Sequence, residues 1–449
     1  MKLPLTPPDV HQLIAGNKPE QFIKLVSAIR SQVIEGQYLH WDELRHRKPP
    51  AGVASAEDWW TGVKMARIPL YRALDSLLDK SGKPFVFGLP EPVLVALHHI
   101  DRDAAGKIAS AADIAIPEQR DRYIWRSLVE EAITSSQLEG ASTTRQVAKT
   151  MLQEGRKPRD RSERMIFNNY RAMELIRTFR KDSVTTERIL ELHRILTEDT
   201  LDDPADAGRL RQADDVRVED NRDGTLIHQP PPHTELSGRL ERLCEFANST
   251  EITSPFIHPV IRAILVHFMI GYDHPFVDGN GRTARALFYW VMARQGYWLM
   301  EFLSISHVLR KAPSQYVRAY LHTETDGNDT TYFIIHQLDV IHKSIAALHE
   351  YLDHAAKEQR ATEKLLTASP RLRDRLNHRQ IALLTHALKH PGFRYRIEGH
   401  QRTHVTAYQT ARSDLLALTE SGLLSQSKSG KAYVFTAPAD LRKRIDKLA

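Results

Sequence analysis

Twelve consecutive residues, from His274 to Arg285, combine the side chains that phosphate chemistry requires: His-Pro-Phe-Val-Asp-Gly-Asn-Gly-Arg-Thr-Ala-Arg. A histidine such as His274 can be neutral near pH 7 and can then accept a proton from a hydroxyl. Asp278 offers a hard oxygen ligand, suited to a Mg²⁺ ion that is shared with phosphates. Arg282 and Arg285 are three residues apart, so on a helix they share one face and could grip a polyphosphate. These residue types predict phosphoryl or nucleotidyl transfer, in which the protein supplies positioning and charge stabilisation.

The surrounding sequence predicts that this stretch is a loop between two helices. Residues 259–270 are apolar on nearly every side, which indicates a helix buried in a core. The apolar residues after the loop recur at helical spacing: Ala284, Leu287, Phe288 and Val291. A second helix should therefore begin near Gly281. Gly279 and Gly281 let backbone N–H groups approach a ligand, and the helix start adds unpaired donors with a partial positive charge. The sequence predicts a phosphate-binding helix N-terminus.

The stretch resembles the signature of Fic-domain proteins, His-Pro-Phe-x-Asp/Glu-Gly-Asn-Gly-Arg-x-x-Arg, at every fixed position. Most active members of that family are AMPylases, which transfer AMP from ATP to a Ser, Thr or Tyr hydroxyl of a protein. The resemblance implies that His274 is the general base and that Asp278 holds a Mg²⁺ ion bridging the α- and β-phosphates. It also implies that Gly279, Asn280 and Gly281 form an anion hole around the α- and β-phosphates. Arg282 would bind the β-phosphate, and Arg285 would bind the γ-phosphate.

A second motif lies upstream, at the end of a predicted helix. Residues from Trp125 to Ser136 recur at helical spacing, and Gly140 stands where such a helix would stop. Ser135 opens the motif. Glu139 would then lie at the negative end of the helix dipole, which favours a cation nearby; a solvated Glu is the alternative. Residues 135–140 resemble the Ser/Thr-x-x-x-Glu-Gly/Asn inhibitory motif of Fic proteins. The resemblance implies an inhibitory helix at about 121–140, in which Glu139 pairs with Arg285 and occupies the space of the γ-phosphate.

A short hairpin is predicted between these two motifs. Residues 216–218 and 225–228 look like strands on either side of Asp223-Gly224, a turn sequence. In Fic proteins the corresponding hairpin is a flap that binds the target protein by main-chain pairing. We expect a protein target along the flap near 216–228, with an ordinary surface hairpin as the alternative. Residues 208–211, Gly-Arg-Leu-Arg, also resemble a Gly-x-x-Arg segment of the family.

Composition is that of a globular protein. Of the 449 residues, 41% are apolar and 26% are charged. A single cysteine, Cys244, allows no intrachain disulfide. His258, His267 and His274 lack the i, i+4 spacing of zinc-binding helices, so we do not expect them to form a zinc site. The first eight residues lack the apolar core of a signal peptide, and no apolar run is long enough to span a bilayer, so we expect a cytoplasmic protein without membrane contact.

The chain is predicted to be mostly α-helical and to have four parts. An N-terminal helical layer covers residues 1–110, with Trp41, Trp59 and Trp60 as packing residues. The resemblance implies a Fic-type helical core at 111–350, which carries the inhibitory helix and the hairpin. A polar helix at 351–370 then links this core to a tail at 371–449. A homodimer is left open by the sequence.

The tail is predicted to be a winged helix-turn-helix. Residues 371–449 hold 15 Lys and Arg but only six Asp and Glu, which concentrates the basic charge of the chain there. One helix is expected at 380–388 and a second from about 407, with Gly422 as its stop and a two-stranded wing behind it. The buried stripe of the second helix is expected to be Tyr408, Ala411, Leu415 and Leu418. The tail could contact DNA through residues 400–431. The side chains that could reach it are Arg402, His404, Gln409, Arg412, Lys428 and Lys431. Protein docking is the alternative.

The sequence thus predicts a Mg²⁺- and ATP-dependent protein adenylyltransferase that is autoinhibited by Glu139. Three alternatives stay open. The same site could remove AMP from a protein, it could use another nucleotide donor, or the chain could be a nucleotide-sensing transcriptional regulator that binds DNA.

Overall fold

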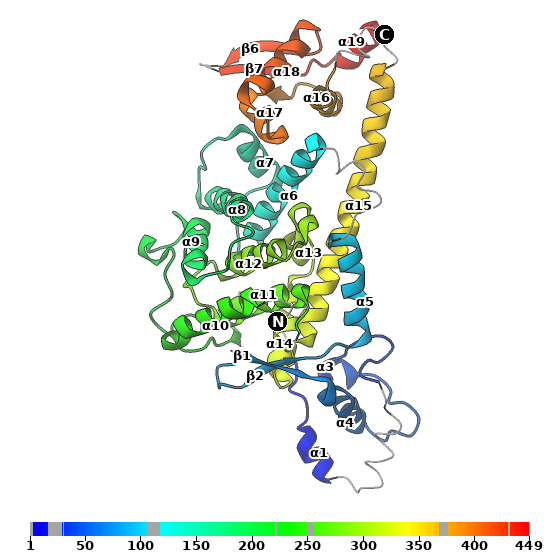
Figure 1. The fold of residues 1–449 in the computed structure, drawn as a ribbon, viewed down its shortest axis with the longest axis vertical. Coiled ribbons are helices and arrows are strands. Elements are labelled where there is room, and N and C mark those ends of the chain that lie inside the picture. The colour runs from blue at the N-terminus through cyan, green and yellow to red at the C-terminus, as the bar shows by residue number, and fades with distance from the viewer. Residues whose placement is uncertain are drawn as a thin grey trace. The chain divides into compact units, whose positions relative to one another are not determined.

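The computed structural model describes residues 3–16, 29, 31–105, 117–220, 222–249, 256–367, 376–429 and 432–448. Within these residues the chain is mostly helical, as predicted, with two two-stranded sheets and one three-stranded sheet (Figure 1). None of the helices in this described part combines the length and apolar character needed to cross a membrane. Contacts divide the chain into two compact units. The first consists of residues 1–105, 171–300 and 305–343, and the second of 106–170, 301–304 and 344–449.

The first unit begins with a layer of short helices and one hairpin. Its elements are α1 (Val10–Gly16), α3 (Trp41–Leu44), α4 (Ala56–Arg67), η1 (Ile68–Leu70), the antiparallel strands β1 (Arg72–Leu78) and β2 (Pro84–Phe87), α5 (Glu91–Ile100) and the π-helical turn η2 (Asp101–Ala105). Trp41, Trp59 and Trp60 are buried in one hydrophobic cluster, which confirms the packing role predicted for them.

The rest of the first unit holds the predicted catalytic loop. Its elements are α9 (Thr186–Thr197), η3 (Pro204–Asp206), β3 (Val218–Glu219), β4 (Leu226–His228), η4 (His233–Glu235), α10 (Leu236–Asn248), α11 (Pro259–Asp273), α12 (Asn280–Arg294), η5 (Trp298–Phe302), α13 (Ile305–Leu309) and α14 (Pro313–Thr325). Three of the helices, α8 (Arg161–Thr178), η5 and α15 (Thr331–Thr367), include residues of both units.

The helices α11 and α12 lie side by side at the centre of the first unit (Figure 1). α11 starts at a proline, which is well suited to a first helical turn, and the His258 side chain accepts a hydrogen bond from the Val260 amide at 3.3 Å. Every residue of α11 except Gly271 is buried, and so are most residues of α12. The predicted buried helix, and a second helix starting next to Gly281, are therefore confirmed. Their burial on all sides fixes the ends of the loop between them.

The second unit contains a helical cluster with the predicted inhibitory helix. α6 (Pro117–Leu138) and α7 (Arg145–Glu154) pack against α8. Their shared core is Trp125, Val129, Ala132, Ile133, Ala148, Met151, Leu152 and Ile166. The segment at 121–140 is thus grouped with residues 344–449 and not with the loop at 274–285.

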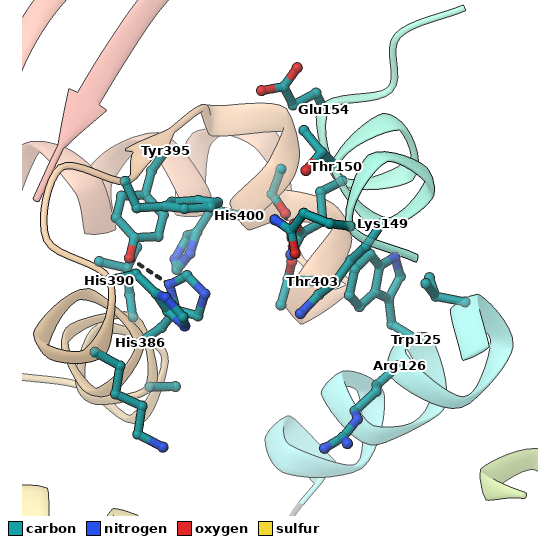
Figure 2. Close-up of a pocket in the computed structure, with 18 of the residues that line it drawn as sticks. Trp125, Arg126, Lys149, Thr150, Glu154, His386, His390, Tyr395, His400 and Thr403 are labelled. Carbon is teal, nitrogen blue, oxygen red and sulfur yellow. Dashed lines mark hydrogen bonds between the residues drawn. The ribbon is translucent and has the colours of Figure 1, made fainter. Parts of the chain in front are cut away.

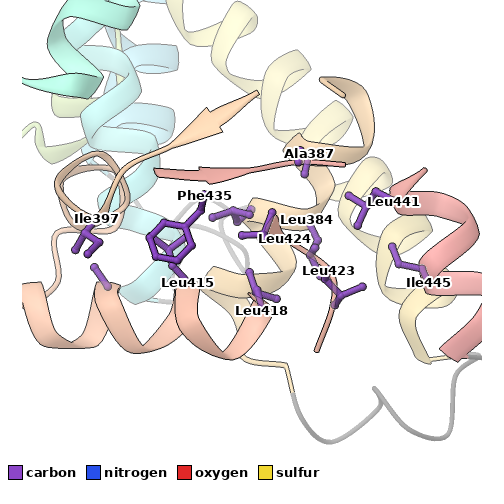
Figure 3. Close-up of a cluster of buried hydrophobic side chains, with 13 residues drawn as sticks. Leu384, Ala387, Ile397, Leu415, Leu418, Leu423, Leu424, Phe435, Leu441 and Ile445 are labelled. Carbon is purple, nitrogen blue, oxygen red and sulfur yellow. The ribbon is translucent and has the colours of Figure 1, made fainter. Parts of the chain in front are cut away.

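The C-terminal part of the second unit has its own core. In chain order it contains α16 (His378–Lys389), β5 (Arg394–Tyr395), α17 (Ile397–His404), α18 (Tyr408–Glu420), β6 (Ser425–Ser429), β7 (Ala432–Thr436) and α19 (Leu441–Leu448). The strands form an antiparallel sheet in the order β5-β7-β6. Figure 3 shows the buried side chains that these helices and strands share, among them Leu384, Leu415, Leu418 and Phe435.

Two details of the tail differ from the prediction. The segment between the two predicted helices contains a further helix, α17, and the strand β5. Tyr408 is 43% exposed, whereas Ala411, Leu415 and Leu418 are fully buried. The prediction that Tyr408 belongs to the buried stripe is therefore wrong. Tyr408 is the first residue of α18, and because helical side chains lean toward the N-terminus it projects beyond the part of the helix that the core covers.

Candidate active site

His274 follows the last residue of α11 and adopts a left-handed backbone conformation, with φ 42° and ψ 58°. This turn reverses the chain directly after a buried helix and points it toward α12. The Nδ1 atom of His274 lies 2.6 Å from the carbonyl oxygen of Gly271. Because a carbonyl can only accept a hydrogen bond, Nδ1 carries the proton, and the lone pair of the neutral ring is on Nε2. The imidazole is thus held in one tautomer, with Nε2 as its basic atom.

The Asn280 side chain forms hydrogen bonds across the loop, to the backbone of Phe276. Its Oδ1 accepts a hydrogen bond from the Phe276 amide at 3.0 Å, and its Nδ2 donates to the Phe276 carbonyl at 2.8 Å. Asn280 is 4% exposed and Phe276 is fully buried, so both bonds are shielded from water. The side chain of Asn280 therefore fixes the shape of the loop, while its amide lies in the first turn of α12.

His193, on α9, holds the loop from the other side. Its ring stacks on Phe276, with centroids 3.7 Å apart and planes 6° from parallel. Nε2 lies 2.9 Å from the Asp278 carbonyl, to which it donates, and Nδ1 accepts from the Gly208 amide at 2.9 Å. Burial lowers the pKa of His193 to about 4, which keeps the ring neutral, as this pair of hydrogen bonds requires. His193 thus joins α9, the Gly208 turn and the loop.

Arg211 anchors the start of the loop. Its Nε donates to the His274 carbonyl at 3.0 Å, and its amide donates to the Pro275 carbonyl at 2.9 Å. Its two terminal nitrogens donate to the carbonyls of Ala213 and Pro231. The side chain is almost completely buried. The segment that resembles Gly-x-x-Arg therefore holds the backbone of the predicted base.

The loop ends at the N-terminus of α12. Gly279 has φ 84°, a conformation that favours glycine, and a Cβ there would lie 2.7 Å from the Thr197 methyl carbon. The first hydrogen bond of α12 runs from the Thr283 amide to the Gly279 carbonyl, so the amides of residues 280–282 precede the helical ladder. The helix dipole and the amides of this first turn favour a phosphate group.

The charged residues of the loop gather around this end. Arg282 is buried, and its Nη1 donates to the Leu196 carbonyl at 2.8 Å. Its Nη2 lies 3.7 Å from Asp278 Oδ2, and the Asp278 side chain is 42% exposed. Arg285 is buried one helical turn further along. A guanidinium group and an accessible carboxylate next to a helix N-terminus fit a Mg²⁺–nucleoside triphosphate: Asp278 could hold the metal, and Arg282 and the amides could hold phosphates.

The predicted hairpin is present, but its strands are shorter than the sequence suggested. β3 pairs with β4 in antiparallel register, Val218 opposite His228 and Glu219 opposite Leu226. Its turn includes Gly224 at φ 69°, whereas residue 221 lies outside the described residues. His228 Nε2 donates to the Tyr272 carbonyl at 2.7 Å, which ties the hairpin to the end of α11, two residues before His274.

The inhibitory motif forms a helix end, as predicted. α6 ends at Leu138, and Gly140 adopts φ 91°. The amides of Gly140 and Ala141 donate to the carbonyls of Gln137 and Ser136 at 3.2 and 3.0 Å, which is a typical glycine-dependent helix stop. Ser135 is buried in the last turn. Glu139 belongs to the second unit and Arg285 to the first, so the pairing of these two side chains stays a prediction.

Comparison with known proteins identifies the domain around this loop. Residues 183–292 match the family model described as Fic/DOC family. A protein adenylyltransferase Fic of Drosophila erecta is 35% identical over 117 residues, which are 26% of this chain and 21% of that protein. The protein of the same name in Drosophila virilis is 36% identical over 117 residues, 26% of this chain and 22% of that protein. The chain therefore contains a Fic domain, and it spans about a fifth of the length of these relatives.

Solved structures of Fic proteins are also similar to this chain. A Fic family protein from Desulfovibrio desulfuricans G20 aligns with 77% of this chain and 94% of its own, at 18% identity and a TM-score of 0.48. Fic-1 from C. elegans aligns with 58% of this chain and 70% of its own, at 22% identity and a TM-score of 0.43.

Within the predicted loop, Asn280 is bonded to Phe276, Arg282 lies beside Asp278, and Arg285 is buried on α12. The structure also shows two residues outside the loop that hold it, His193 and Arg211. His193 was missed because a histidine among the buried residues Ile189, Leu192 and Leu196 reads as part of a helix core. The signal available in the sequence was its polar ring on an otherwise apolar helix face. Arg211 was noted only through its resemblance to the Gly-x-x-Arg segment.

Proposed function

We propose that this chain is a protein adenylyltransferase that transfers AMP from ATP to a Ser, Thr or Tyr hydroxyl of a protein. The observation that carries the proposal is the fixed tautomer of His274, whose Nδ1 donates to the Gly271 carbonyl six residues before α12 begins at Asn280. The names of the relatives support adenylyl transfer.

In the proposed reaction, Nε2 of His274 accepts the proton of the target hydroxyl. The hydroxyl oxygen forms a bond to the α-phosphorus of ATP, and the bond from that phosphorus to the bridging oxygen breaks, releasing pyrophosphate. The amides at the start of α12 and the Arg282 guanidinium stabilise the charge on the phosphates. A Mg²⁺ ion held by Asp278 would neutralise part of that charge. The β3–β4 hairpin would pair with the target segment by main-chain hydrogen bonds.

Autoinhibition by Glu139 is part of the proposal. It is supported by the position of this carboxylate at the end of α6 and by the resemblance to the inhibitory motif. Glu139→Gly should raise self-modification well above that of the wild type. Glu420→Gly, which removes an exposed carboxylate from the end of α18, is the matched control and should leave the rate unchanged.

The test uses ATP labelled in turn at the α- and γ-phosphates. Label from the α-position should appear on the protein, whereas label from the γ-position should not. Transfer of the γ-label would instead show phosphate transfer. Incubating the self-modified Glu139→Gly protein with wild-type enzyme, in the absence of ATP, distinguishes removal of AMP from its addition.

DNA binding by the tail is a second proposal. Gln409 and Arg412 are exposed on α18, and Lys428 is exposed on β6. In contrast, Arg402 donates to the Leu152 carbonyl of α7 at 3.3 Å, and His404 is buried. Lys431 lies outside the described residues. A gel shift with the producer's own promoter DNA at a stated salt concentration should be weakened by Arg412→Ala; no shift for the wild type would contradict the proposal.

A further inference from the structure

A cavity of about 740 Å³ lies within the second unit (Figure 2). One wall comes from α6 and α7 and includes Trp125 and Lys149; the facing wall comes from α16, β5 and α17 and includes His386, Tyr395 and His400. All of its lining residues belong to the second unit, whereas the loop at 274–285 belongs to the first. The cavity is therefore distinct from the loop at 274–285, which is called the Fic loop below.

The lining is strongly basic. Its cationic residues are Arg126, Arg145, Lys149, Lys389, Arg394 and Arg396, against Glu130 and Glu154 as the only carboxylates among the described lining residues. Arg145 Nη2 lies 2.5 Å from Glu130 Oε2, so this ion pair neutralises one cation and one carboxylate and leaves five basic residues against Glu154. A concave surface with such an excess of one charge focuses the electrostatic field and attracts an anion.

The walls also present flat ring faces. His386 lies 2.8 Å from the Tyr395 hydroxyl through Nδ1, and its ring centroid is 4.8 Å from that of Phe393. The Phe393 and Tyr395 ring centroids are 4.9 Å apart with planes at 56°, so the three rings contact one another at an angle and together form an aromatic wall of the cavity. Across the cavity, Trp125 is buried on α6 and the Arg126 guanidinium lies 3.2 Å from the Tyr351 ring centre. Ring faces of this kind bind a planar ligand by stacking.

We propose that this cavity binds a small organic anion with a planar ring, of about the size of a nucleotide. Its volume lies in the range of cavities that hold ligands of this size. An inorganic anion would satisfy the cations but would leave most of the cavity and the aromatic wall in contact with water. A neutral aromatic compound would fill the ring surfaces but would gain nothing from the excess of basic residues in the lining. A ligand that carries both an anionic group and a planar ring matches the basic lining and the aromatic rings at once.

Calorimetry on the full chain with 1-naphthyl phosphate tests this inference. The compound should bind one to one, and inorganic phosphate and 1-naphthol, which each keep one feature, should bind at least about tenfold more weakly. Lys149→Gln and Arg396→Gln should each weaken the binding of 1-naphthyl phosphate about tenfold, because each removes a charge-assisted contact. Lys443→Gln, on the exposed face of α19, is the matched control and should bind as the wild type does.

Three results would overturn the inference. They are no binding of 1-naphthyl phosphate, equal affinity in the wild type and in both cavity variants, or equal affinity for inorganic phosphate and 1-naphthyl phosphate. None of them bears on AMP transfer, which is measured separately at the Fic loop.

Discussion

Replacing His193 by phenylalanine tests how the loop is held. Phenylalanine keeps a flat ring that can stack on Phe276, but it removes both hydrogen bonds of the imidazole. The Asp278 carbonyl and the Gly208 amide then lose their partners next to a fully buried side chain. Each unsatisfied buried group costs about 1–3 kcal/mol, so the free energy of unfolding at pH 7.5 should fall by about 2–5 kcal/mol.

The same variant should respond differently to acid. The pKa of His193 is lowered to about 4 by burial, against an ordinary value of 6.5. Between these two values the unfolded chain binds a proton that the folded protein does not, so the wild type loses stability as pH falls from 6.5 to 4. This loss amounts to about 2 kcal/mol by pH 5. Phenylalanine does not titrate. The difference in the free energy of unfolding between the wild type and His193→Phe should therefore be about 2 kcal/mol smaller at pH 5 than at pH 7.5.

The measurement is urea unfolding of the full chain at both pH values. Hydrogen exchange of peptides from α9 and α12 separates the transition of this unit from that of the rest. His98→Phe, an exposed position on α5, is the control and should show no such narrowing. A gap that is the same at pH 7.5 and pH 5 would refute the reasoning, because it would mean that His193 is not held neutral in the folded protein.

Three further predictions concern the loop and the tail. Asn280→Ala should lower the free energy of unfolding by about 2–5 kcal/mol, measured by urea denaturation, because both main-chain groups of Phe276 lose their partner. Gly279→Ala should abolish AMP transfer and lower the melting temperature, since a left-handed alanine costs about 1–2 kcal/mol and its methyl group would meet α9; a fully active variant would argue against this geometry. Asp414→Asn should destabilise the tail by about 2–4 kcal/mol at neutral pH, because Asp414 is buried and accepts hydrogen bonds from Arg379 at 2.6 and 3.1 Å. Burial alone would raise the pKa of Asp414, but hydrogen bonds from its neighbours outweigh this and lower the pKa below 3.8. The wild type therefore loses this stabilisation in acid, and the difference in stability between wild type and Asp414→Asn should shrink as pH falls below about 4.

Features with a local cause were predictable from the sequence. The apolar run at 259–270 and the glycines of the loop predicted α11, the turn and α12, because helix burial and glycine conformation are properties of short segments. The start of α9 is equally local, since the Thr185 side chain caps it by accepting a hydrogen bond from the Arg188 amide at 3.3 Å. The turn at Gly224 likewise predicted the β3–β4 hairpin.

Features that depend on distant partners were not predictable. The contact of His193 with the Asp278 carbonyl joins residues 85 positions apart, and the contact of Arg211 with the His274 carbonyl joins residues 63 apart. Nothing in the neighbourhood of either residue indicates its partner. The helix α17 was missed for a similar reason, since in Ile397–His404 only Ile397 is an apolar core residue and periodicity gives no signal.

The central claim, that His274 is the base of an AMP-transfer site, is tested most directly with ATP labelled at the α-phosphate. In the Glu139→Gly background, His274→Ala should abolish transfer of the label to protein, while His98→Ala, an exposed histidine on α5, should leave it unchanged. Transfer that persists in His274→Ala at the rate of its parent would contradict the account.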